Sequence, residues 1–118
     1  AKNNNNDTAL IVASGIGDDK TVKRLIDAGA DVNAKNNNND TALIMASRSD
    51  SDKAVKFLID AGADVNAQNN DGKTALIMAA DFIKWTNISL LIGAGASKNI
   101  KDKNGKTVYD YRPDIDHL

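Results

Sequence analysis

The stretch IDAGADVNA, from Ile26 to Ala34, is repeated letter for letter from Ile59 to Ala67. It returns in altered form as IGAGASKNI, from Ile92 to Ile100, and each copy begins 33 residues after the one before. The same interval separates four threonines, which are Thr8, Thr41, Thr74 and Thr107. A fixed period of this length predicts an array of structural repeats, in which each repeat buries its apolar surface against its neighbours.

Each period carries the pattern of two short helices. The first should begin just after the threonine, because its hydroxyl can accept a hydrogen bond from a backbone N–H of the first turn. The second has apolar residues at spacings of three and four, which form one stripe along a helix. These residues are Val22, Leu25 and Ile26, then Val55, Leu58 and Ile59, then Ile88, Leu91 and Ile92. A glycine follows each second helix, where a positive φ is favoured: Gly29, Gly62 and Gly95.

A helix-turn-helix-loop unit that begins Thr-Ala-Leu and ends Gly-Ala-Asp-Val-Asn-Ala, with a period of 33 residues, resembles the ankyrin repeat. The resemblance covers essentially the whole chain. It implies an all-α, ankyrin-type helix-turn-helix solenoid with short β-hairpin-like loops. We expect a single domain over residues 1–118, with repeats at approximately 2–34, 35–67 and 68–100 and a partial or capping repeat at 101–118.

Two features depart from the family's pattern. The family's Thr-Pro-Leu-His reads Thr-Ala-Leu-Ile in all three repeats, so an isoleucine should add apolar burial where the histidine stands. The glycine two residues before the threonine is kept as Gly72 and Gly105 but is replaced by Asn6 and Asn39 in the first two repeats. Asparagine tolerates the left-handed backbone region, so the loop turns should persist.

The two ends also differ from the middle. Pro113 stands six residues after Thr107 and should stop the helix that begins there, because proline removes a backbone donor. At the other end, Leu10 and Ile11 have no repeat before them in this sequence. Since such stacks need polar end caps, we expect further sequence upstream rather than an exposed apolar end.

The composition argues against several classes of protein. A net charge of −1 gives no electrostatic reason to expect binding to nucleic acid or to a membrane surface. The absence of cysteine excludes disulfides and thiolate chemistry and permits a reducing compartment. No apolar run approaches the length of a membrane span. We expect a cytoplasmic location, with a secreted effector as the alternative.

No motif in the sequence indicates catalysis. Asp71-Gly72-Lys73-Thr74 resembles the end of a phosphate-binding loop, but Ala67 stands where that motif needs its first glycine. The single histidine, His117, has no cysteine or second histidine to join it in a nucleophile pair or a zinc site. We expect no catalytic residue, no cofactor and no metal.

The first two repeats are near copies whose differences cluster. Residues 2–34 and 35–67 differ at seven positions, and five of these lie between Val12/Met45 and Asp18/Ser51. This patch covers the end of the first helix and the following turn. Drift at a tolerant turn and selection on a binding surface explain the cluster equally well.

The resemblance implies where a partner would bind. Ankyrin arrays bind on the concave surface made by the loop tips and the exposed side of the first helices, and these positions can be counted from each threonine. The candidates are Asp40, Met45, Arg48, Ser49, Lys73, Met78, Asp81, Phe82, Trp85 and Tyr111. Arginine and aromatic residues are the usual energetic anchors of an interface. Three alternatives stay open: the two methionines could pack between helices, Phe82 and Trp85 could fill the third repeat's turn, and Arg48 could be ordinary solvated surface.

We therefore expect a non-catalytic protein–protein interaction module, monomeric, that binds another protein of unknown identity through this concave face. The alternative is a regulatory or targeting segment of a longer enzyme or effector whose catalytic part lies outside this chain. Self-association through the N-terminal face is a third hypothesis. Fold alone does not decide among them.

Overall fold

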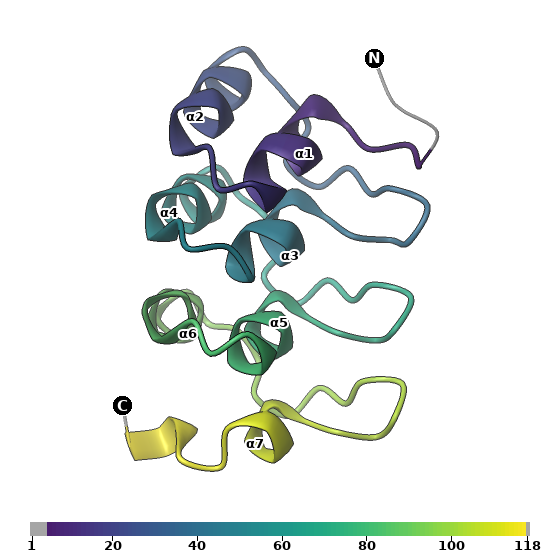
Figure 1. The fold of residues 1–118 in the computed structure, drawn as a ribbon, viewed down its shortest axis with the longest axis vertical. Coiled ribbons are helices and arrows are strands. Elements are labelled where there is room, and N and C mark those ends of the chain that lie inside the picture. Colours follow the sequence, from purple (N-terminus) through teal and green to yellow (C-terminus); the bar gives the residue numbers. More distant parts are fainter. Residues whose placement is uncertain (1–4, 118) are drawn as a thin grey trace.

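The computed structural model describes residues 5–117, with the exception of the side chain of His117. The first residues of the expected first repeat and that histidine side chain therefore lie outside the described part. The described chain is a stack of helix pairs with extents of 39 × 25 × 20 Å. Figure 1 shows the first helices in one column and the second helices in a column beside them. The loops project from the first-helix side of the stack, away from the second helices.

Three full helix pairs and one shortened pair make up the stack. The pairs are α1 (Ala9–Gly15) with α2 (Asp19–Asp27), α3 (Ala42–Ser47) with α4 (Asp52–Asp60), and α5 (Ala75–Asp81) with α6 (Trp85–Gly93). The last pair is α7 (Val108–Tyr111) with a 3₁₀ turn, η1 (Ile115–His117). No strand occurs between residues 5 and 117, and the all-helical solenoid expected from the sequence is confirmed.

The helix boundaries follow the predicted signals. The hydroxyl of each threonine before α1, α3 and α5 accepts a hydrogen bond from the backbone N–H three residues later, at 3.1–3.2 Å. The glycines after α2, α4 and α6 have φ of 91°, 91° and 89°, as predicted for residues that end a helix. Asn6 and Asn39, both with φ of 59°, occupy the left-handed region that the missing loop glycines would have taken.

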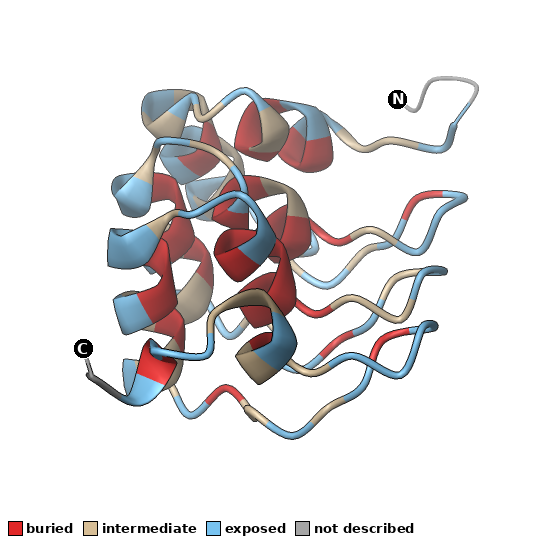
Figure 2. Ribbon diagram, turned by 60° about the horizontal axis from the view of Figure 1, so that its bottom comes forward, coloured by how far each residue is buried: buried red, intermediate tan, exposed pale blue. Residues whose placement is uncertain are grey.

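The core lies between the two helix columns and between successive repeats. Figure 2 shows the buried residues concentrated on the facing sides of the helices. Ile44 and Ile77, which stand where the family has histidine, are each 1% exposed. Burying an isoleucine side chain stabilises a fold by about 1.5–3 kcal/mol relative to leaving it exposed, so both residues contribute to the packing between repeats.

The C-terminal end confirms the effect predicted for Pro113. Helix α7 ends at Tyr111, and the chain then turns so that Ile115 is buried, at 1% exposure, beside α6. Arg112 anchors this turn, because its Nε donates to the carbonyl oxygen of Ala80 at 3.2 Å. At the N-terminal end, Leu10 and Ile11 are buried, and the exposed apolar side chains are those of Val12 and Ile16.

Candidate functional site

Two of the candidate residues meet across the junction between the second and third repeats. Arg48 caps the C-terminus of α3, and its guanidinium carbon lies 5.8 Å from the centre of the Phe82 ring. Phe82 caps α5 and is 46% exposed, and Arg48 is exposed as well. Neither residue fills a core position, so the structure places a cation–π pair on the surface.

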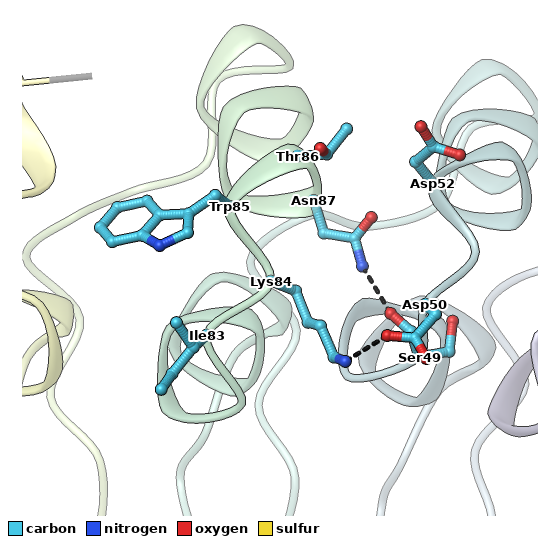
Figure 3. Close-up of a pocket in the computed structure, with 8 residues that line it drawn as sticks. All are labelled: Ser49, Asp50, Asp52, Ile83, Lys84, Trp85, Thr86 and Asn87. Atoms are coloured by element: carbon cyan, nitrogen blue, oxygen red, sulfur yellow. Dashed lines mark hydrogen bonds and ion pairs between the residues drawn. The ribbon is translucent and has the colours of Figure 1, made fainter.

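The segment just after Phe82 is tied to the same turn of the second repeat (Figure 3). Lys84 forms an ion pair with Asp50, and the buried amide of Asn87 donates from Nδ2 to the carbonyl oxygens of Ser47 and Ser49, both at 3.0 Å. Sequence reasoning missed Asp50, Lys84 and Asn87. The available signal was the cluster of differences between the first two repeats, which includes positions 48 and 50. Part of that cluster is therefore explained by contacts within the chain.

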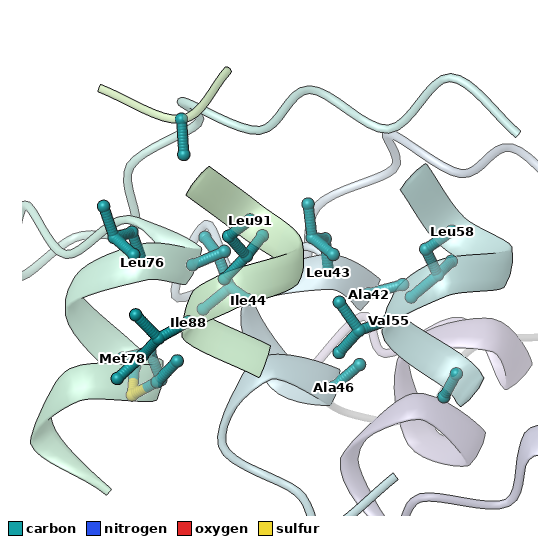
Figure 4. Packing of buried hydrophobic residues seen from close by; sticks show 14 of the residues in the cluster. Ala42, Leu43, Ile44, Ala46, Val55, Leu58, Leu76, Met78, Ile88 and Leu91 are labelled. Atoms are coloured by element: carbon teal, nitrogen blue, oxygen red, sulfur yellow. The ribbon is translucent and has the colours of Figure 1, made fainter. Parts of the chain in front are cut away.

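The remaining candidates on the first helices are less accessible than expected. Met78 is 8% exposed and belongs to the core (Figure 4), so we leave it out of the candidate surface. Met45, at the equivalent position, is half-buried. The hydroxyl of Ser49 is engaged within its own turn, where it donates to the carbonyl oxygen of Ala46 at 2.6 Å.

Lys73, Asp81 and Tyr111 form a second group of candidates. The Nζ of Lys73 lies 3.3 Å from Oδ2 of Asp81 and 5.9 Å from the centre of the Tyr111 ring. Asp81 is exposed, and the other two are half-buried. The group thus links the third repeat to α7 on the side of the first helices.

Asp40, the last of the loop candidates, takes part in a ladder between loops. The Oδ1 of Asn69 accepts hydrogen bonds from the backbone N–H groups of Asp71 and Lys73 within its own loop. Its Nδ2 donates to Oδ1 of Asp40 at 3.0 Å. Asn36 makes the same bond to Asp7 at 2.7 Å. Asp40 and Lys73 stand at equivalent positions in successive loops and have different partners, Asn69 and Asp81.

At the last junction the ladder changes its chemistry. Asp102 replaces the asparagine, and the hydroxyl of Tyr111 donates to its carboxylate. Burial raises the pKa of Asp102, but the hydrogen bonds from Tyr111 and from the backbone N–H groups of Lys106 and Asn104 outweigh it and lower that pKa below its usual value. The same hydrogen bond, with burial, raises the pKa of Tyr111 to about 12.

This pair predicts a pH-dependent contribution to stability. Because the pKa of Tyr111 is raised in the folded state, its share of the stability should be present below pH 10 and lost between pH 10 and about 12. Tyr111→Phe should lack this loss and cost about 1 kcal/mol at neutral pH. Urea unfolding of both proteins at pH 7 and pH 11 tests this. A difference between them that does not shrink at pH 11 would contradict it.

Within the described residues, no group of three or more acidic, histidine or cysteine side chains is placed to hold a metal ion. None of the helices described is both long enough and apolar enough to cross a membrane.

Two models of known protein families match the chain, and together they cover residues 1–111. A family model described as ankyrin repeats (3 copies) matches residues 1–69, which is more than half of the chain. The chain belongs to the ankyrin repeat family. A second model, ankyrin repeats (many copies), matches residues 58–111. No curated protein matches this ankyrin-repeat chain significantly. Ankyrin repeats are generally protein–protein interaction modules and are typically non-catalytic.

Proposed function

We propose that this ankyrin-repeat protein is a non-catalytic module that binds a partner protein on the concave side of its stack, formed by the first helices and the loops. The exposed Arg48–Phe82 pair is the observation that carries the proposal. Arginine and aromatic side chains dominate the energetics of interfaces, and here the two lie together on one side of the stack.

The neighbouring groups supply a polar rim. Lys73 and Asp81, with Tyr111 beside them, flank the pair toward the C-terminal end, and Asp40 lies in the loop of the second repeat. A central anchor surrounded by polar groups is the usual anatomy of a protein interface. Because the surface belongs to short helices fixed on both sides by neighbouring repeats, binding should need little reordering.

Affinity capture with a matched pair of variants tests the proposal. The bait is the full chain, the sample is lysate of the source cell, and the readout is mass spectrometry followed by a dissociation constant for the purified partner. We expect Arg48→Glu/Phe82→Ala to weaken binding by about tenfold or more, because it removes an anchor of each kind.

Lys56→Glu is the control, because it reverses a charge on the exposed side of α4, away from the first helices. It should leave the dissociation constant unchanged. If the partner binds the folded double variant as tightly as the wild type, its contacts lie on another surface and the proposal is wrong.

A further inference from the structure

The turn between α5 and α6 is held in a conformation that its sequence disfavours. Ile83 has φ of 59°, and a β-branched residue is rarely found in this left-handed region. The equivalent residue of the first repeat is Gly17, with φ of 73°, which takes the conformation without strain. The contacts of Lys84 and Asn87 with the second repeat, described above, keep the turn in place.

This strained turn presents apolar surface to solvent. Ile83 is 55% exposed and Trp85 is 36% exposed, and Figure 3 shows both side chains pointing away from the Lys84–Asp50 pair. A protein gains nothing in stability from holding an isoleucine in a strained backbone with its side chain in water. Backbone strain of this kind is found most often at active sites and ligand-binding sites.

A groove of about 310 Å³ adjoins these two residues, between residues 49–52 and residues 83–87. We call it the edge groove. Its polar lining comes from Ser49, Thr86 and Asn87, and its charged lining from Asp50, Asp52 and Lys84. Ile83 and Trp85 also line it, and their side chains extend outward from its edge.

The charges that line the edge groove do not cancel. Lys84 is paired with Asp50, whose side chain remains 92% exposed. Asp52 is exposed, and within the described part of the chain it has neither a hydrogen bond nor an ion pair through its carboxylate. Two carboxylates and one ammonium group leave this lining with a net negative charge, and the complementary group is a cation.

We propose that the edge groove binds a segment of a partner protein that carries an arginine or lysine beside a large apolar residue. The cationic side chain enters the groove between the carboxylates of Asp50 and Asp52, and the apolar side chain packs on Ile83 and Trp85. This site goes beyond the proposed concave surface and shares only Ser49 and Trp85 with the residues first expected there. The preformed turn lowers the entropic cost of binding.

A random peptide library displayed on phage and selected on the full chain tests this site. We expect the selected peptides to carry a lysine or arginine within two positions of an apolar or aromatic residue. Titration of the tightest peptide, made synthetically, into isotope-labelled protein should shift the amide signals of residues 49–52 and 83–87 in NMR spectra.

Variants and a modified peptide separate the two halves of the site. Trp85→Ala should weaken the peptide about tenfold. Asp52→Asn, or replacement of the peptide's arginine by neutral citrulline, should weaken it about threefold, and high salt should reduce that difference. Asp19→Asn is the control, because Asp19 is the counterpart of Asp52 in the first repeat and does not line the edge groove.

The outcomes are distinct from those of the capture experiment. Selected peptides without a cationic residue, equal binding to Asp52→Asn, or shifts confined to the first helices would each overturn the edge groove. So would a selection that yields no peptide binding there. None of these results would touch the concave-surface proposal, which rests on Arg48 and Phe82.

Discussion

Gly72→Ala should lower the free energy of unfolding by about 3–4 kcal/mol, because two penalties act at one position. Gly72 has φ of 73°, where an L side chain is strained. A Cβ added there would also lie 2.7 Å from the backbone nitrogen of Lys103 in the next loop. That backbone is fixed, since the same nitrogen donates to the carbonyl oxygen of Asp71 at 2.9 Å.

Gly62→Ala is the matched control for this prediction. Gly62 has φ of 91°, but a Cβ there would have no heavy atom within 4 Å. It should therefore show the strain penalty alone, about 1–2 kcal/mol. Urea unfolding of both variants measures the difference, and equal losses would show that the two loops are not packed as closely as described.

The consequences of Gly72→Ala should also spread along the stack. The loop of residues 69–73 begins the third repeat and is bonded to the last loop through Lys103 and Asp71. Each repeat is stabilised only by its neighbours. Amide hydrogen exchange should therefore accelerate in both α5 and α7, and least in α1. Faster exchange confined to the loop itself would argue against this coupling.

The helices and their caps could be predicted because their signals are local or periodic. A threonine, an apolar stripe and a glycine at a fixed interval determine where each helix begins and ends, and the structure places these residues as predicted. The end of α7 could also be predicted, since Pro113 acts through its own backbone. Contacts between successive loops, such as the bond from Asn69 to Asp40, are harder to predict because no local sequence pattern marks them.

The candidate site was harder to predict because it depends on side chains that break the period. Met45 and Met78 occupy equivalent positions, yet only Met78 is buried. Their surroundings differ in one visible way. Met45 lies beside Gly15, where an added Cβ would be 3.3 Å from the methionine's methyl carbon, whereas the residue equivalent to Gly15 for Met78 is Arg48.

The contacts of the α5–α6 turn illustrate the same limit. Lys84 and Asn87 meet partners 34 to 40 residues away, and neither contact recurs in the other repeats. Nothing in a single period indicates that Asn87 would turn its amide toward the second repeat, because Thr21 and Ala54 stand at the equivalent positions. Such contacts follow only from the three-dimensional packing.

Asn87→Asp should strongly destabilise the protein at neutral pH. Asn87 is 3% exposed, and its Nδ2 donates to two carbonyl oxygens at 3.0 Å. Aspartate would replace that donor by a second acceptor, so a buried negative charge would face two carbonyl oxygens. We expect a loss of about 3–5 kcal/mol in the free energy of unfolding, a cost typical of an uncompensated buried charge.

The loss should depend on pH in a direction that identifies its cause. Burial and the nearby carbonyl oxygens should raise the pKa of the new carboxyl in the folded state above its unfolded value, so the variant should lose stability as the pH rises above about 4. At pH 4 the protonated acid can donate one hydrogen bond, and the deficit relative to the wild type should shrink. Urea unfolding of both proteins at pH 4 and pH 7 measures this.

Asn104→Asp serves as the control. Asn104 is exposed in the last loop, so this substitution should change the free energy of unfolding little at either pH. A deficit for Asn87→Asp that stays constant between pH 4 and pH 7 would point to altered packing instead of charge. If the deficit follows the pH as expected, the amide signals of residues 47–51 should shift with it. The α3–α4 turn, which carries Arg48 and one wall of the edge groove, would then depend for its position on the Asn87 amide as well as on the Lys84–Asp50 pair.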